Sequence, residues 1–92
     1  MEQYTFKSLI ISGAHLNEAD CIKLTNDKLD ITCYEDDYSI TVIVNDETQT
    51  THTGLHKQTR ELIQYAKRNE INKIVFDCDG DIVPALINFE EE

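Results

Sequence analysis

The sequence has few of the residues on which disulfide-rich, membrane-spanning or disordered proteins depend. Its 92 residues include three Cys, three Gly, one Pro and no Trp. Three cysteines cannot all pair within one chain, and no Cys-x-x-Cys occurs, so we expect no disulfide framework. No stretch approaches the roughly 20 apolar residues of a membrane-spanning helix, and the first residues lack the pattern of a signal peptide. These absences predict a protein of the reducing cytosol.

Basic residues are also scarce. The chain has 8 Lys and Arg against 18 Asp and Glu, which gives a formal net charge of −10. Such a chain will not bind nucleic acid or an anionic membrane through bulk electrostatics, because those partners are negative as well. It would attract a basic protein surface, and that attraction would weaken as the salt concentration rises. The alternative is that the charge serves solubility alone.

What the sequence does contain is typical of one globular domain. Apolar residues make up 40% of the chain and charged residues 28%, which is enough for a single modest core. Runs rich in β-branched and aromatic residues, and runs with helical spacing of apolar residues, alternate along the chain. The runs predict strands at 4–12, 29–35, 38–45 and 72–78, and helices at about 17–27 and 55–69. We therefore expect a single α+β domain over residues 1–92.

The two helices are predicted from different signals. Asn17 is a good N-cap for the first helix, whose inward side chains would be Ala19, Ile22 and Leu24. The second helix has a longer apolar stripe, and its inward positions are Leu55, Thr59, Leu62, Ile63 and Ala66.

The order of these elements is β-α-β-β-α-β followed by a short C-terminal extension. This order is that of the ferredoxin-like split βαβ fold, in which the first and third strands are central. The most apolar strand runs are 8–11 (SLII) and 40–44 (ITVIV), as strands buried on both faces should be. The strand at 29–35 carries Asp30 and Glu35 and is typical of an edge.

Two short motifs resemble a family of small proteins encoded by prophages, plasmids and other mobile elements, grouped as a domain of unknown function. The motifs are Ser12-Gly13-Ala14-His15-Leu16 and Phe76-Asp77-Cys78-Asp79-Gly80, followed by Leu86 and Phe89. The chain departs from the resemblance at its end, where 90–92 are Glu and the family has a Trp. The resemblance implies a mobile-element setting and no particular reaction. Small acidic proteins of that setting often bind and inhibit a host defence protein.

The second motif also resembles the nucleophile motif of haloacid-dehalogenase-type phosphatases. Only twelve residues follow Gly80, however, so the other groups of that active site are missing. A calcium loop starting at Asp77 fails as well, since Ile82 and Asn88 occupy its Gly and Glu positions. We predict no catalytic residue, no metal site and no cofactor. The competing hypothesis is a metal-assisted phosphoester or nucleotide hydrolase that uses Asp77, Asp79 and Asp81.

The remaining Cys and His residues favour structural roles. Cys33 and Cys78 share strand phases with Ile31 and Phe76, which predicts that both thiols lie in the core. His15 is expected to cap or bond the backbone at the turn into the first helix. His52 and His56 are four residues apart, but no third ligand with zinc-like spacing accompanies them.

Exposed carboxylates beside tyrosines are the feature that favours a function. The predicted partner-binding residues are Tyr34, Glu35, Asp36, Asp37, Tyr38, Asp46 and Glu47. Carboxylates alternating along an extended segment lie about 7 Å apart and can imitate a phosphate backbone. We therefore expect a protein of the host cytosol that binds a basic, nucleic-acid-binding host protein, such as a CRISPR effector, and inhibits it. A third hypothesis is a homo-oligomeric accessory protein that pairs through the 29–35 edge strand.

Overall fold

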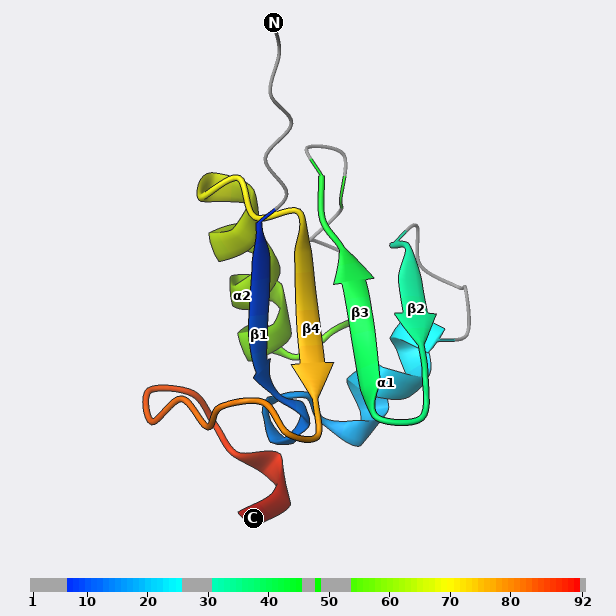
Figure 1. The fold of residues 1–92 in the computed structure, drawn as a ribbon, viewed down its shortest axis with the longest axis vertical. Coiled ribbons are helices and arrows are strands. Elements are labelled where there is room, and N and C mark those ends of the chain that lie inside the picture. Colours follow the sequence, from blue (N-terminus) through cyan, green and yellow to red (C-terminus); the bar gives the residue numbers. More distant parts are fainter. Residues whose placement is uncertain (1–6, 26–30, 46–47, 49–53, 92) are drawn as a thin grey trace, which may run out of the picture.

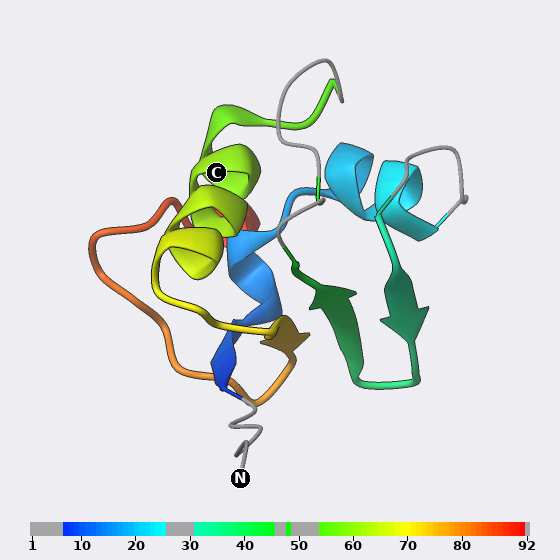
Figure 2. The same cartoon turned by 90° about the horizontal axis from the view of Figure 1, so that it is seen from above.

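Four strands form one mixed sheet, and two helices cover one of its faces (Figures 1 and 2). The computed structural model describes residues 7–25, 31–45, 48 and 54–91. The elements are β1 (Ser8–Ser12), η1 (Gly13–His15), α1 (Glu18–Thr25), β2 (Cys33–Glu35), β3 (Ser39–Ile43), α2 (Lys57–Arg68), β4 (Lys73–Asp77) and η2 (Phe89–Glu91). The predicted α+β class and the order of strands and helices along the chain are confirmed.

The order of strands in the sheet differs from the ferredoxin-like prediction. The sheet runs β1-β4-β3-β2, with β1 parallel to β4 and the other two pairs antiparallel. The central position of β3 and the edge position of β2 are as expected, but β1 lies at an edge and β4 takes the centre. The prediction for β1 is wrong because its apolar run is not buried on both faces: Ile10 is 56% exposed. A continuous apolar run in a strand is thus not proof of a central place in the sheet.

The core lies between the sheet and the helices. Ile11, Val42, Ile74 and Phe76 point from three strands toward α2, and alternate residues of each strand point to the other face. All five inward positions predicted for α2 are buried. Each fully buried Leu or Ile side chain stabilises the fold by about 1.5–3 kcal/mol relative to its exposed state.

The first helix starts where the sequence predicts but turns a different face inward. Asn17 caps α1, since its Oδ1 accepts the Asp20 N–H at 2.7 Å. Leu24 is buried as expected, whereas Ala19 is exposed and Ile22 is 51% exposed. The buried position between Ala19 and Ile22 belongs to Asp20. Neither α1 nor α2 reaches the length and apolar character that crossing a membrane requires, within the described residues.

The C-terminal extension lies across the end of the sheet at which β1 and β4 terminate, and not beside an edge strand (Figure 1). Residues 78–88 form turns and irregular backbone, and the short helix η2 follows them. The described part of the extension, 78–91, therefore adds no strand to the sheet.

Candidate functional site

The carboxyl ends of the parallel strands β1 and β4 meet the β2–β3 turn at one end of the sheet (Figure 1). This arrangement forms a cleft lined by Ser12, Gly13, Ala14, Glu35, Asp36, Asp37, Tyr38, Ser39, Ile40, Phe76, Cys78 and Glu90. We call the carboxylates of the β2–β3 turn and of the turn at the end of β4, Glu35, Asp36, Asp37, Asp77 and Asp79, the acidic end. The structure thus brings four predicted partner-binding residues beside both family-like motifs. The predicted Asp46 and Glu47 lie outside the described residues.

The β2–β3 turn is held by the side chain of Asp36. Its Oδ1 accepts the backbone N–H of Tyr38 at 2.8 Å and that of Ser39 at 2.9 Å. The hydrogen bond from Tyr38, and to a smaller extent that from Ser39, lowers the pKa of Asp36. The turn therefore keeps this carboxylate ionised and has a defined shape. It presents Tyr38 at 72% exposure, and Tyr34, on the adjoining strand, is 63% exposed.

Backbone contacts fix the two motifs against each other. The Ser12 N–H donates to the Asp81 carbonyl at 2.9 Å, and the Cys78 N–H donates to the Tyr38 carbonyl at 2.9 Å. Gly80 packs so closely on β1 that a Cβ there would lie 2.4 Å from the Ile11 carbonyl oxygen. The Asp79-Gly80 turn therefore joins the end of β1 to the β2–β3 turn, and the acidic end is one connected unit.

The thiol of Cys78 lies in this unit but is poorly suited to act as a nucleophile. Desolvation raises its pKa, and the negative charges of Asp79 and Asp77 raise it further. Because the thiolate is the reactive form, these causes suppress its reactivity. The predicted core position of Cys78 is wrong, since β4 ends at Asp77 and the next residue turns outward. Cys33 packs against the core as predicted.

Three side chains in the β4 turn could offer ligand atoms to a cation. Ligand atoms of Asp77, Cys78 and Asp79 lie within 4.8 Å of one another, while Asp81 is not part of the group. Asp77 Oδ1 already accepts the Asp79 N–H at 2.8 Å. This is an Asx turn, which accounts for the arrangement without a cation. The geometry therefore lends no support of its own to the hydrolase hypothesis.

His15 holds the C-terminal extension rather than the turn into α1. The imidazole is fully buried; Nδ1 donates to the Ile87 carbonyl at 2.9 Å, and Nε2 accepts the Val83 N–H at 2.9 Å. Gln58 supports the same segment, with its Oε1 accepting the Ile87 N–H at 2.8 Å. The expectation that His15 bonds backbone is correct, but the backbone belongs to a segment about 70 residues away. The sequence indicates Gln58 only as a polar residue beside the apolar stripe of α2.

Asp20 is the buried carboxylate that displaces Ile22 from the inner face of α1. Its two oxygens accept the His56 N–H at 3.0 Å each, and Oδ2 also accepts the Thr59 hydroxyl. These contacts satisfy backbone and side-chain donors in the first turn of α2, where a negative charge is favourable. Asp20 therefore joins α1 to α2, and the sequence gives no sign of this role.

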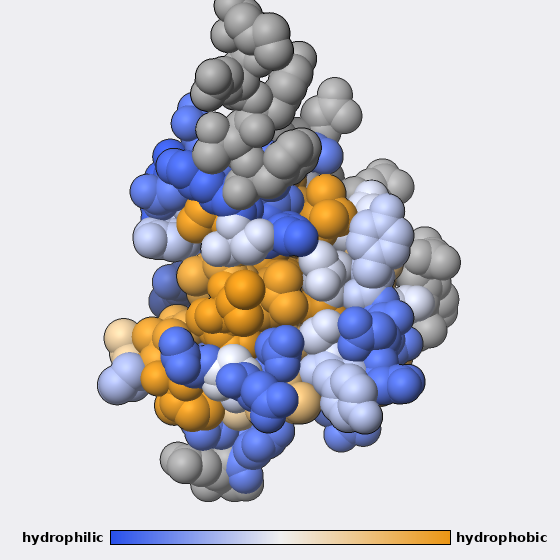
Figure 3. Space-filling view, in the orientation of Figure 1, coloured by the Kyte–Doolittle hydropathy of each residue, from blue (hydrophilic) through white to orange (hydrophobic). Residues whose placement is uncertain are grey.

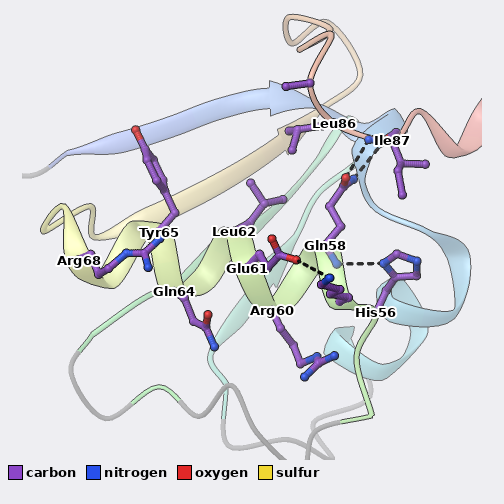
Figure 4. A pocket seen from close by; sticks show the side chains of 12 residues that line it. His56, Gln58, Arg60, Glu61, Leu62, Gln64, Tyr65, Arg68, Leu86 and Ile87 are labelled. Carbon is purple, nitrogen blue, oxygen red and sulfur yellow. Dashed lines mark hydrogen bonds and ion pairs between the residues drawn. The ribbon is translucent and has the colours of Figure 1, made fainter.

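A second surface hollow lies between α2 and the C-terminal extension (Figure 4), and it shares no lining residue with the cleft at the acidic end. Tyr65 and Leu62 from α2 and Leu86 from the extension supply its apolar part. Lys57, Arg60 and Arg68 also line it, against one carboxylate, Glu61, so its net charge is opposite in sign to that of the acidic end. No feature of the sequence pointed to this hollow.

Fold and site together define a small two-layer α+β protein with a cluster of five carboxylates, the acidic end, where β1 and β4 terminate. Residues 8–91 match the C-terminal domain of a family of unknown function, DUF5983, and the chain belongs to this family. The match confirms the coarser expectation, a domain family of unknown function. Neither a curated protein nor a solved structure matches the chain.

Proposed function

We propose that the protein acts by binding another protein through its acidic end, and that the partner presents a basic, nucleic-acid-binding surface. In this proposal the setting is the cytosol of a host that carries a mobile element, and binding inhibits a defence or nucleic-acid-handling protein. The observation that carries the proposal is the β2–β3 turn: two exposed tyrosines flank three consecutive carboxylates on a backbone held by hydrogen bonds.

The tyrosines supply the affinity. Tyr34 and Tyr38 are the two most exposed large hydrophobic side chains among the described residues. Tyr is enriched among the residues that contribute most to protein interfaces, because it buries a large ring and loses little conformational entropy. Since the turn is already ordered, binding costs little further ordering of the backbone.

The carboxylates supply the selection of a basic partner. The one ion pair found in the described residues joins Lys57 and Glu61 on α2, far from the turn. Among the described residues, no lysine or arginine forms an ion pair with Glu35, Asp36 or Asp37. The electric field of these carboxylates therefore extends into solvent. Such a field accelerates encounter with a Lys/Arg-lined groove and resembles that of a phosphate backbone.

Site-specific photo-crosslinking in the host tests this proposal. A benzophenone amino acid at position 38 should crosslink to a basic, nucleic-acid-binding protein. The same group at position 22, an exposed site on α1, should give no such product. Crosslinks of equal yield from both positions, or only from position 22, would show that the β2–β3 turn is not the binding surface.

A further inference from the structure

The face of the sheet opposite the helices carries a row of side chains that crosses all four strands and is apolar on β1 and β4. Register places Ile10, Val75, Thr41 and Tyr34 side by side, one from each strand in spatial order. Their neighbours along each strand point to the core, so these four point away from it. Figure 3 shows this face, with hydrophobic residues gathered in the middle and hydrophilic residues above and below.

This composition is unusual for a sheet face in water. A solvated face normally alternates with polar side chains. Here Ile10 and Tyr34 are exposed, and Val75 and Ile43 are only half-buried. A contiguous apolar patch rimmed by charge is the mark of a contact surface.

The charges on this face are arranged so that it complements itself. Lys73, Val75 and Asp77 alternate along β4 and therefore point to the same face. Lys73 and Asp77 are four residues apart, or about 13 Å, with Val75 midway. A two-fold axis that lies in the plane between two such sheets, passes over Val75 and runs perpendicular to β4 would place Lys73 of each copy opposite Asp77 of the other. The described residues contain no ion pair that engages Lys73 or Asp77 within one copy.

We infer that a second copy of this chain covers the open face, forming a two-fold dimer in which the two sheets pack face to face. The apolar rows meet at the centre, and Lys73 and Asp77 form two equivalent ion pairs across the axis. This inference goes beyond the proposed function, and because both surfaces include Tyr34, the second copy and the partner would compete for that side chain. It also differs from pairing through the β2 edge, which would leave Ile10 and Val75 exposed.

The size of the face sets the strength and salt dependence of the dimer. Three strands of five residues and one of three cover about 200–300 Å². A stable interface usually buries about 800 Å² per partner, so the charged ends must contribute. The dimer should therefore be weak, and it should dissociate as the salt concentration rises.

Sedimentation equilibrium over a range of protein concentrations tests the inference. The mass should rise from the 10.6 kDa of one chain toward twice that value, and more so at low salt. Ile10→Glu should abolish the rise. Ile22→Glu, which adds the same charge at an equally exposed isoleucine on α1, should not. A monomer at every concentration, or a dimer that survives Ile10→Glu, would overturn the inference; the latter would favour pairing through an edge strand.

A charge exchange tests the two-fold axis itself. Lys73→Glu and Asp77→Lys should each raise the dissociation constant by about tenfold or more, because attraction becomes repulsion. An equimolar mixture of the two variants should form the heterodimer, since both ion pairs are then restored.

Asp77→Lys also removes the hydrogen bond that the Asp79 N–H donates to the Asp77 side chain. Lys73→Glu alone therefore serves as a second readout: added salt should strengthen its dimer, the reverse of the unchanged chain. A mixture that stays monomeric while the unchanged chain dimerises, or a Lys73→Glu dimer that weakens with salt, contradicts this axis.

Discussion

At the scale of single residues, buried polar side chains connect segments that the sequence keeps apart. His15 holds the extension at Val83 and Ile87, and Asp20 holds the start of α2. Both side chains are almost completely buried, and each of their nitrogen and oxygen atoms takes part in a hydrogen bond. Their contacts explain structure and leave no group free for chemistry, which is why we assign them to the fold and not to the site.

His15→Ala should destabilise the protein by about 2–4 kcal/mol, because it leaves the Val83 N–H without its partner, removes one of the two donors to the Ile87 carbonyl and opens a cavity. Urea denaturation measures the loss. Hydrogen exchange of the Val83 amide should accelerate more than that of the Ile74 amide in the core. Equal acceleration of both amides would mean that His15 does not hold the extension locally.

Cys78 should be alkylated slowly for an exposed thiol. Its raised pKa leaves less thiolate at a given pH, so the midpoint of its rate–pH profile should lie above the ordinary value near 9.0. Mass spectrometry resolved by residue follows the reaction with iodoacetamide. Asp79→Asn should move the midpoint to lower pH because it removes a raising charge, whereas Glu70→Gln, on the loop before β4, should not move it. An unchanged midpoint in Asp79→Asn would refute the electrostatic cause.

At the scale of elements, the sequence predicts best where one periodicity explains every residue. The stripe of α2 has this property, and the helix and its buried face are as predicted. It fails for α1, because Asp20 occupies a buried position for the sake of a contact with α2 that no local pattern reveals. Prediction also fails for β1, because its apolar residue Ile10 is exposed on the open face of an edge strand and is not buried in a central strand.

Sheet order illustrates the same limit. Alternation shows which residues share a face of one strand, but it does not show which strands are neighbours. The parallel pairing of β1 with β4 is fixed by contacts at both ends of the pair. Lys7 C=O accepts the Asn72 N–H at one end, and Ser12 N–H bonds Asp81 at the other. These contacts join residues more than 60 positions apart.

Gly80→Ala tests how tightly the acidic end is built. The added methyl would meet the Ile11 carbonyl at 2.4 Å, so backbone must shift and the free energy of unfolding should fall by about 1–3 kcal/mol. Gly13→Ala is the matched control, because its nearest contact, the Asp77 carbonyl oxygen, would be at an ordinary 3.9 Å. Urea denaturation should separate the two variants. Equal stabilities would show that the β1 and β4 turns do not pack as described.

At the scale of the whole molecule, charge is separated along the sheet. The acidic end lies at the carboxyl ends of β1 and β4, and Lys7 and Lys73 lie together at their amino ends. The sequence predicts the acidic turn, since 34–38 is one local segment. It does not predict that Cys78 and Asp79 join that turn, or that an apolar row adjoins it, because both depend on the pairing of distant strands.

The most direct test of the account is affinity capture from host lysate at low and high salt, with two double variants of equal net charge. Glu35→Lys with Asp37→Lys alters the β2–β3 turn, and Glu61→Lys with Glu70→Lys makes the same change around α2. We expect the unchanged chain and the α2 variant to retain a basic, nucleic-acid-binding protein that high salt releases, and the turn variant to lose it. Equal retention by both variants, or retention that salt does not alter, would contradict binding through the acidic end.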